Sequence, residues 1–281
     1  MNPFLNIQQI KTLTAFEFEA ACRRFTHYAR LENNLALCRI LTSYKIYVDT
    51  RDTSLAPNLI MDGFWESWLS QTLAKLIRPG DVCIDIGANM GYYSVLMSAL
   101  AGGEGRTIAV EPNPHLCRLL RLTSGINHPG FGVAEVALSN TSGKIAFHIP
   151  ENAFGDASLL ERTDRPSDKT HKVKVETIRF DDLAQKMGIE RVDVIKMDVE
   201  GAEPLAFEGM QQTIENNPGL KMFIEYSPHL YNNAKSFTTY LFSRFHVHRI
   251  RDVENIEVLN DAAIESLLQL QSHADLYLVR R

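Results

Sequence analysis

Residues 82–91 read VCIDIGANMG, a short apolar run that ends in an acid and a glycine-containing turn. A buried run followed by glycine and then by a helical pattern is typical of the first strand, loop and helix of a parallel sheet. Gly87 and Gly91 can adopt positive φ angles and let a ligand approach the backbone closely. The helix that follows offers free N–H groups at its start. The sequence therefore predicts a ligand site at this turn.

Strand and helix patterns alternate along the chain beyond this turn. The predicted buried strands cover residues 82–86, 106–110, 131–138, 192–197, 222–226, 245–250 and 275–279. Helical patterns near residues 92–100 and 115–122, and another that starts near Ala202, lie between them. This alternation predicts an α/β fold with a parallel sheet covered on both faces. Residues 142–149 and 172–177 alternate in period two and predict a separate antiparallel pair.

The N-terminal region has a different pattern. Thr14 and Glu17 have the spacing of a capping box, and apolar residues then recur at helical spacing. We interpret residues 1–45 as helical, and expect 1–60 to form a helical extension that caps the pocket or mediates dimerisation. Residues 61–281 are expected to form the ligand-binding domain, whose first helix covers residues 64–77.

Composition excludes several classes of protein. The 281 residues carry 29 Lys and Arg against 34 Asp and Glu, and this net charge of −5 argues against a nucleic-acid or membrane-surface binder. No apolar run approaches the roughly 18 residues of a membrane span, and the N-terminus does not resemble a signal peptide. The four cysteines form no CxxC pair, which argues against a zinc site. These features predict a cytoplasmic protein with reduced, buried thiols.

The acid that follows the next strand indicates the kind of ligand. Glu111 lies about 20 residues beyond the glycine turn, where an acid accepts the hydroxyls of a ribose. The loop reads GxxxG instead of the dinucleotide pattern GxGxxG, and Asp85 would repel a pyrophosphate but attract a cation. S-adenosylmethionine is cationic and has no phosphate. Two alternatives remain: an NAD-dependent oxidoreductase on a variant loop, and a non-catalytic cofactor-binding protein.

Three stretches of sequence resemble a known family. VCIDIGANMGYYS at 82–94, VEPNP at 110–114 and IKMDVEGAE at 195–203 are similar to blocks of the FkbM-type class I S-adenosylmethionine-dependent methyltransferases. Residues 137–139, Ala-Leu-Ser, occur between them in the expected order. The resemblance covers roughly residues 60–228 and implies a Rossmann-like, seven-stranded, mostly parallel sheet. It also implies bound S-adenosylmethionine and methyl transfer to a hydroxyl oxygen.

The resemblance also implies roles for individual residues. Residues of the glycine loop would surround the methionine half of the cofactor, Glu111 would bind the ribose, and residues 137–139 would lie near adenine. Glu66, upstream of the first strand, matches a recurrent acid of the family. The predicted cofactor-binding residues are Glu66, Asp85, Gly87, Ala88, Asn89, Gly91, Glu111, Pro112, Ala137, Leu138, Ser139 and Asp198.

Methyl transfer also requires a group that accepts the proton of the attacking hydroxyl. Asp198 ends the fourth strand, Glu200 follows it on the turn, and Glu225 ends the next strand. These acids and His229, just beyond the fifth strand, are the predicted catalytic residues. Glu203 belongs to the same edge, but an acid in a first helical turn also simply favours the helix dipole. The acids could coordinate Mg²⁺, but nothing in the spacing supports it, and we predict no metal site.

The resulting hypothesis is an S-adenosylmethionine-dependent O-methyltransferase that acts on a hydroxyl of a sugar, a glycan or a secondary metabolite. The expected partners are a small-molecule or glycan acceptor and, through the N-terminal helices, a second copy of the chain. Residues 151–171 form a long polar stretch between two predicted strands. A loop of this length inside a domain is typical of a lid. We predict that it selects the acceptor.

Overall fold

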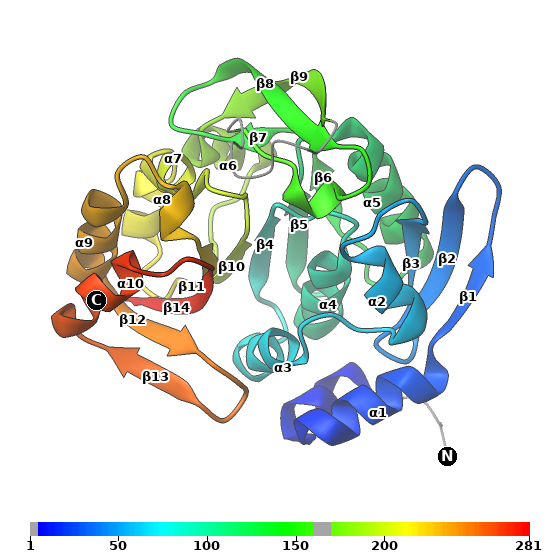
Figure 1. The fold of residues 1–281 in the computed structure, drawn as a ribbon. Coiled ribbons are helices and arrows are strands. Elements are labelled where there is room, and N and C mark those ends of the chain that lie inside the picture. The colour runs from blue at the N-terminus through cyan, green and yellow to red at the C-terminus, as the bar shows by residue number, and fades with distance from the viewer. Residues whose placement is uncertain (1–4, 160–169) are drawn as a thin grey trace.

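The computed structural model describes residues 5–159 and 170–281 (Figure 1). Its main sheet, within these residues, has eight strands in the order β13-β12-β14-β11-β10-β4-β5-β6. The strands are β4 (Val82–Ile86), β5 (Arg106–Val110), β6 (Gly132–Ala134), β10 (Val194–Met197), β11 (Lys221–Tyr226), β12 (Phe245–Ile250), β13 (Ile256–Leu259) and β14 (Ala274–Arg280).

The five strands from β6 to β11 are parallel, and β14 inserts antiparallel between β11 and β12. The predicted mostly parallel α/β sheet is therefore confirmed. It has eight strands instead of seven in the described residues, because β12 turns back through a hairpin and pairs with β13. This extra strand lies at the sheet edge far from the glycine turn (Figure 1).

Helices cover both faces of this sheet. Cys83 of β4 belongs to one hydrophobic cluster and its neighbour Ile84 to a second, as the alternation of side chains along a strand requires. The first cluster includes α3 (Ser67–Leu76), α4 (Tyr92–Ala101) and α5 (Pro114–Ile126). The second includes α6 (Phe180–Met187), α7 (Glu203–Glu208), α8 (Gln211–Asn216), α9 (Ala234–Arg244) and α10 (Ile264–Leu268).

A small second sheet lies beside β6 and has the order β7-β9-β8. Its strands are β7 (Ala137–Leu138), β8 (Gly143–Pro150) and β9 (Thr170–Ile178). The antiparallel pairing of β8 with β9 confirms the pair predicted at 142–149 and 172–177. The single strand predicted at 131–138 is divided between the two sheets, since β6 pairs with β5 and β7 pairs with β9.

The N-terminal region is only partly helical. After η1 (Ile7–Thr12) and α1 (Ala15–Phe25), the chain forms an antiparallel sheet of β1 (His27–Arg30), β2 (Leu35–Ile40) and β3 (Tyr44–Asp49), before α2 (Ala56–Met61). The capping box of Thr14 and Glu17 is present. The helical interpretation of residues 27–45 is wrong. Asn33 and Asn34 have φ angles of 57° and 62°, the conformation of a two-residue hairpin turn, and they reverse the chain between β1 and β2.

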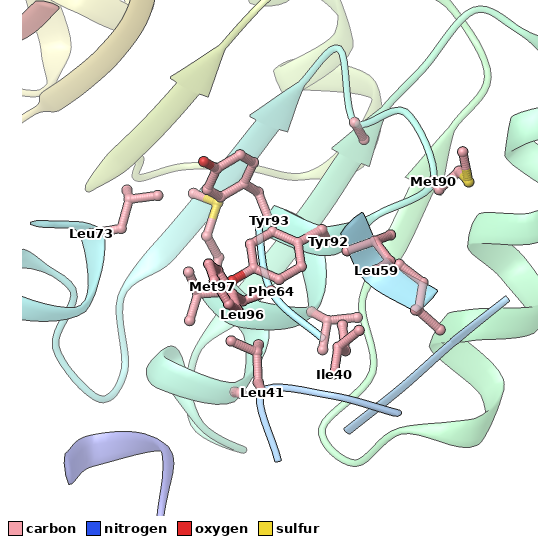
Figure 2. Packing of buried hydrophobic residues seen from close by; sticks show 14 of the residues in the cluster. Ile40, Leu41, Leu59, Phe64, Leu73, Met90, Tyr92, Tyr93, Leu96 and Met97 are labelled. Carbon is pink, nitrogen blue, oxygen red and sulfur yellow. The ribbon is translucent and has the colours of Figure 1, made fainter. Parts of the chain in front are cut away.

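This region packs on the main sheet domain. Figure 2 shows Ile40, Leu41 and Leu59 in one buried cluster with Leu96 and Met97 of α4. Such a shared core fixes the N-terminal region against the face that carries α3 and α4. The proposed boundary at residue 60 stays a prediction.

Two expectations from composition concern the burial of the cysteines and the length of apolar helices. Each of the four cysteines is a buried free thiol, and burial raises the pKa of Cys22 and Cys38 to about 12. These thiols therefore belong to the core and remain protonated near neutral pH. No helix within residues 5–159 and 170–281 is both long and apolar enough to cross a membrane.

Candidate active site

A cavity of about 630 Å³ lies where the parallel strands of the main sheet end. Open α/β sheets bind ligands at this carboxyl edge. Its lining includes the turns after β4, β5, β10 and β11, together with residues 54–55, 65–66, 136–138 and 271–273, and with Phe154, Gly155, Ala157 and Leu159. The predicted site residues in its lining are Glu66, Gly87, Ala88, Asn89, Glu111, Pro112, Ala137, Leu138, Asp198, Glu200, Glu225 and His229. One cavity thus brings together most of the residues that the sequence indicated.

The glycine turn is shaped by contact between two strand ends. Gly87 has a φ angle of 75°, and a Cβ atom built there would lie 1.7 Å from the carbonyl oxygen of Asp198. Only glycine fits, because this gap is far smaller than any real carbon–oxygen contact. Gly91, with a φ angle of 100°, precedes the first turn of α4. The turn therefore places the end of β4 directly against the end of β10.

Backbone groups hold the carboxylate of Glu111 in the cavity wall. Its two oxygens accept N–H groups from Asn89, at 3.0 Å, and from Asn113, at 2.9 Å. The residue is 5% exposed, and burial raises its pKa to about 7. A carboxylate oxygen has room for a further hydrogen bond, so Glu111 can still accept hydroxyl groups from a ligand.

Three predicted cofactor-binding residues lie outside the cavity lining. Asp85 is fully buried and accepts the hydroxyl of Ser94 at 2.5 Å, and burial raises its pKa. Gly91 faces Leu120, and Ser139 donates its N–H to the carbonyl of Ile178. Their direct contact with a ligand therefore stays a prediction.

Three of the predicted catalytic residues form a cluster at the corner of the cavity where β10 and β11 end. Carboxylate oxygens of Asp198, Glu200 and Glu225 lie within 4.8 Å of one another. Burial and the charges of its two neighbours raise the pKa of Glu225 to about 10, so Glu225 retains a proton at neutral pH. The cluster could hold a metal ion by geometry. However, the ammonium of Lys196 lies 3.2 Å from Asp198 Oδ2 and already supplies a positive charge there.

Lys196 also lines the cavity and was not among the predicted site residues. Its ammonium lies 4.9 Å from the centre of the Tyr93 ring, and its side chain is only 7% exposed. The Tyr93 hydroxyl donates to Glu66 Oε2 at 2.5 Å. Burial, and to a smaller extent the negative charge of Asp275, raise the pKa of Glu66 to about 7. A lysine inside an otherwise apolar strand is the sequence signal that points to it, because such a charge needs buried partners.

The remaining predicted residues have simpler positions. Glu203 is 1% exposed and accepts the N–H groups of Val199 and Gly201, at 2.9 and 3.1 Å. It lies outside the cavity lining, so the structure favours the helix-start interpretation. His229, on the short η3 (Pro228–Leu230), is exposed at the rim of the cavity. His273 also lines the rim, 3.9 Å from Glu225, and was not predicted.

Comparison with known proteins identifies the family. The family described as Methyltransferase FkbM domain matches residues 85–258, more than half of the chain. The chain therefore belongs to the FkbM methyltransferase family.

Named relatives share the central part of the chain. The 2-O-methyltransferase NoeI of Sinorhizobium fredii is 31% identical over 156 residues, which cover 51% of this chain and 63% of that protein. The hexuronic acid methyltransferase AglP of Haloferax volcanii is 30% identical over 144 residues, which cover 48% of this chain and 52% of that protein. The chain thus matches between half and two thirds of the length of these relatives.

A solved structure shows a distant likeness. The methyltransferase FkbM from Methylobacillus flagellatus aligns with a TM-score of 0.45 and 14% identity, over 74% of this chain and 50% of that one. The description of the fold therefore rests on the strand order and pairing of this chain itself.

Proposed function

We propose that the chain is an S-adenosylmethionine-dependent O-methyltransferase whose acceptor is a hydroxyl group of a sugar, a glycan or another metabolite. The observation that carries the proposal is Glu111, a carboxylate held by backbone N–H groups in the wall of a cavity that begins at the glycine turn. Membership of a methyltransferase family, and relatives named for methyl transfer to a 2-hydroxyl and to a hexuronic acid, support it.

The residues of the cavity fit an adenosine-containing cation. Glu111 would accept the ribose hydroxyls, and Ala137 and Leu138 would border the adenine. The buried Oδ1 atom of Asn89 has no hydrogen-bond partner within the described residues, so it is available as an acceptor for the amino group of a ligand. The cavity volume is within the range of about 300 to 1,000 Å³ that small-molecule sites occupy. When bound, the cofactor supplies the methyl group on a sulfonium.

The cluster of Asp198, Glu200 and Glu225 would accept the proton of the acceptor hydroxyl. Asp198 is paired with the ammonium of Lys196, whereas Glu225 holds its proton. We therefore assign proton acceptance to Asp198, Glu200 and Glu225 as one coupled unit. Since Lys196 balances the charge of this unit, the proposal contains no metal, and a chelator should leave the activity unchanged.

Calorimetry with S-adenosylmethionine and S-adenosylhomocysteine tests the proposal. We expect both to bind in the micromolar range, and radiolabelled S-adenosylmethionine to transfer its label to at least one member of a panel of neutral sugars, uronic acids and hydroxylated metabolites. NADH serves as the control ligand, since an oxidoreductase would bind it. Absence of binding by S-adenosylmethionine and S-adenosylhomocysteine would exclude the function. Binding without label transfer across the panel would favour the non-catalytic alternative. The predicted homodimer stays a prediction.

A further inference from the structure

Two segments that are far apart in the sequence meet beside the cavity. Residues 52–55 precede α2, and residues 152–158 follow β8 and include the short η2 (Phe154–Asp156). The carbonyl oxygen of Asn152 accepts both the N–H and the hydroxyl of Thr53, each at 2.7 Å. Ser54, Leu55, Phe154 and Gly155 from these segments line the cavity. The N-terminal region thus contributes a wall of the candidate active site.

Asp52 joins the two segments and is 2% exposed. Its Oδ2 atom accepts the N–H groups of Leu55 and Ala56, at 2.8 and 2.9 Å, which fixes the start of α2. Its Oδ1 atom accepts the hydroxyl of Ser54 at 2.8 Å and the N–H of Phe154 at 3.0 Å. Two acceptor positions on each oxygen are therefore filled, and one of the four bonds crosses to the second segment.

Phe154 is held at the glycine-turn corner of the cavity. Its ring is 7% exposed and lies 5.7 Å from the ring of His115, in the first turn of α5, and 5.8 Å from the guanidinium of Arg51. The next residue, Gly155, is so close to the glycine turn that a Cβ atom there would lie 3.1 Å from Asn89 Nδ2. Asn89 is the residue whose N–H group orients Glu111. Phe154 therefore lines the cavity next to a residue that lies against the glycine turn.

We propose that Asp52 is a positioning residue that fixes Phe154 as the outer wall of the cofactor-binding half of the cavity. The inference rests on the proposed function, because it assigns the ligand at this corner. Of residues 151–171, the predicted lid, Phe154, Gly155, Ala157 and Leu159 line the cavity. Residues 160–169 of this stretch lie outside the described part of the chain.

The variant Asp52→Asn tests the contact with little change in shape. An asparagine has only one acceptor oxygen. If this oxygen accepts the two N–H groups at the start of α2, the NH₂ group of the asparagine points toward the N–H of Phe154, which it cannot accept. The bond between the segments is then lost while the helix start is kept. We expect the Kd of S-adenosylhomocysteine, measured by calorimetry, to rise about tenfold. Asp62→Asn is the matched control, because Asp62 pairs with Arg23 outside the cavity lining. This variant should bind S-adenosylhomocysteine with the Kd of the wild type.

A double-mutant cycle with Phe154→Ala separates positioning from a general structural effect. Phe154→Ala alone should also weaken binding by about tenfold or more. If Asp52 acts through Phe154, Asp52→Asn should add less than about twofold in the Phe154→Ala background, because the wall is already lost. A full additional tenfold loss of affinity in the Phe154→Ala background would overturn the inference. Wild-type affinity in Asp52→Asn would overturn it as well. If Asp52→Asn does not fold, wild-type affinity in Phe154→Ala would do so. Failure of the wild type to bind would instead be a failure of the proposed function.

Discussion

Glu111 and Asp198 line the same cavity, but the chain holds their carboxylates in different ways. At the glycine-turn corner, backbone N–H groups of Asn89 and Asn113 orient Glu111. At a second corner, where β10 and β11 end, the carboxylate of Asp198 is held by the side chain of Lys196 and lies among other carboxylates. The first arrangement depends on the path of the backbone alone. The second depends on protonation states and on one buried cation.

This difference indicates how a single fold can serve two tasks. An acid fixed by backbone groups keeps its geometry when neighbouring side chains change, as recognition of an invariant ligand requires. An acid held in a cluster of charges can exchange protons with its neighbours, which suits proton transfer. Variants at the two corners should therefore fail in different ways.

Replacement of the buried cation should cause the largest loss. Lys196→Met would leave Asp198, Asp85 and Glu66 without the positive charge that they share. We expect the free energy of unfolding near neutral pH to fall by about 3 kcal/mol, the low end of the range for breaking a buried pair, because Asp198 is one-third exposed. Urea unfolding measures it. Lys144→Met, at an exposed lysine 4.0 Å from Glu176, is the control. Equal stability of the two variants would contradict the role of Lys196.

The comparison predicts a large effect on cofactor affinity for one glutamine substitution and almost none for another. Glu111→Gln removes the charge that would accept the ribose hydroxyls, and should weaken S-adenosylhomocysteine binding about 100-fold. Glu225→Gln keeps the uncharged state that Glu225 has near neutral pH, and should change the affinity by less than about threefold. Calorimetry on both variants decides the matter. A larger loss in Glu225→Gln than in Glu111→Gln would reverse the proposed assignment of the two corners.

The pH dependence of binding should reflect the corner that Glu111 occupies. Because the pKa of Glu111 is raised to about 7, its carboxyl group is protonated below that pH and must lose the proton to accept two hydroxyls. The Kd of S-adenosylhomocysteine should therefore rise as the pH falls below about 7, by up to about tenfold per unit. Calorimetry between about pH 5.5 and 8 measures the slope. Glu66→Gln is the control: Glu66 has a similar pKa, and this variant should retain the pH dependence of the Kd. A Kd of the wild type that does not change with pH would refute the role of Glu111.

Glu203 extends the comparison to an acid that backbone groups hold outside the cavity lining. Glutamine at this position offers one acceptor oxygen to the N–H groups of Val199 and Gly201, so Glu203→Gln should lower the free energy of unfolding by about 1 kcal/mol. The affinity for S-adenosylhomocysteine should not change. Urea unfolding and calorimetry on one preparation test both statements. A loss of affinity without a loss of stability would place Glu203 in the site.

Local patterns predicted most of the central fold but not the N-terminal region. The strand and glycine turn at 82–91 lie within ten consecutive residues, and continuous apolar runs mark the parallel strands. In β1 and β2, apolar residues happen to recur at spacings that also fit a helix. The deciding features are the positive φ angles of Asn33 and Asn34 and the pairing of β2 with β3, which are properties of the folded chain.

The site was predictable where topology alone brings residues together. Strand-end acids such as Glu111 and Asp198 meet because parallel strands end at one edge. Lys196 was not among the predicted site residues because the acids that surround it, Asp85 and Glu66 among them, come from other elements, and the sequence does not show that they face it. The bond from Phe154 to Asp52 joins residues 102 positions apart, and no local pattern specifies such a contact.

The tryptophans have a practical consequence. The chain contains two, Trp65 and Trp68, and they flank Glu66. Trp65 lines the cavity, and the indole N–H of Trp68 donates at 2.9 Å to Asp275, a carboxyl group beside the acid cluster. Indole emission responds to nearby charge and to water. The tryptophan fluorescence of this protein therefore comes from one indole in the cavity lining and one bonded to a carboxyl group beside the acid cluster, so the chain carries its own optical reporter of ligand binding, without any attached label.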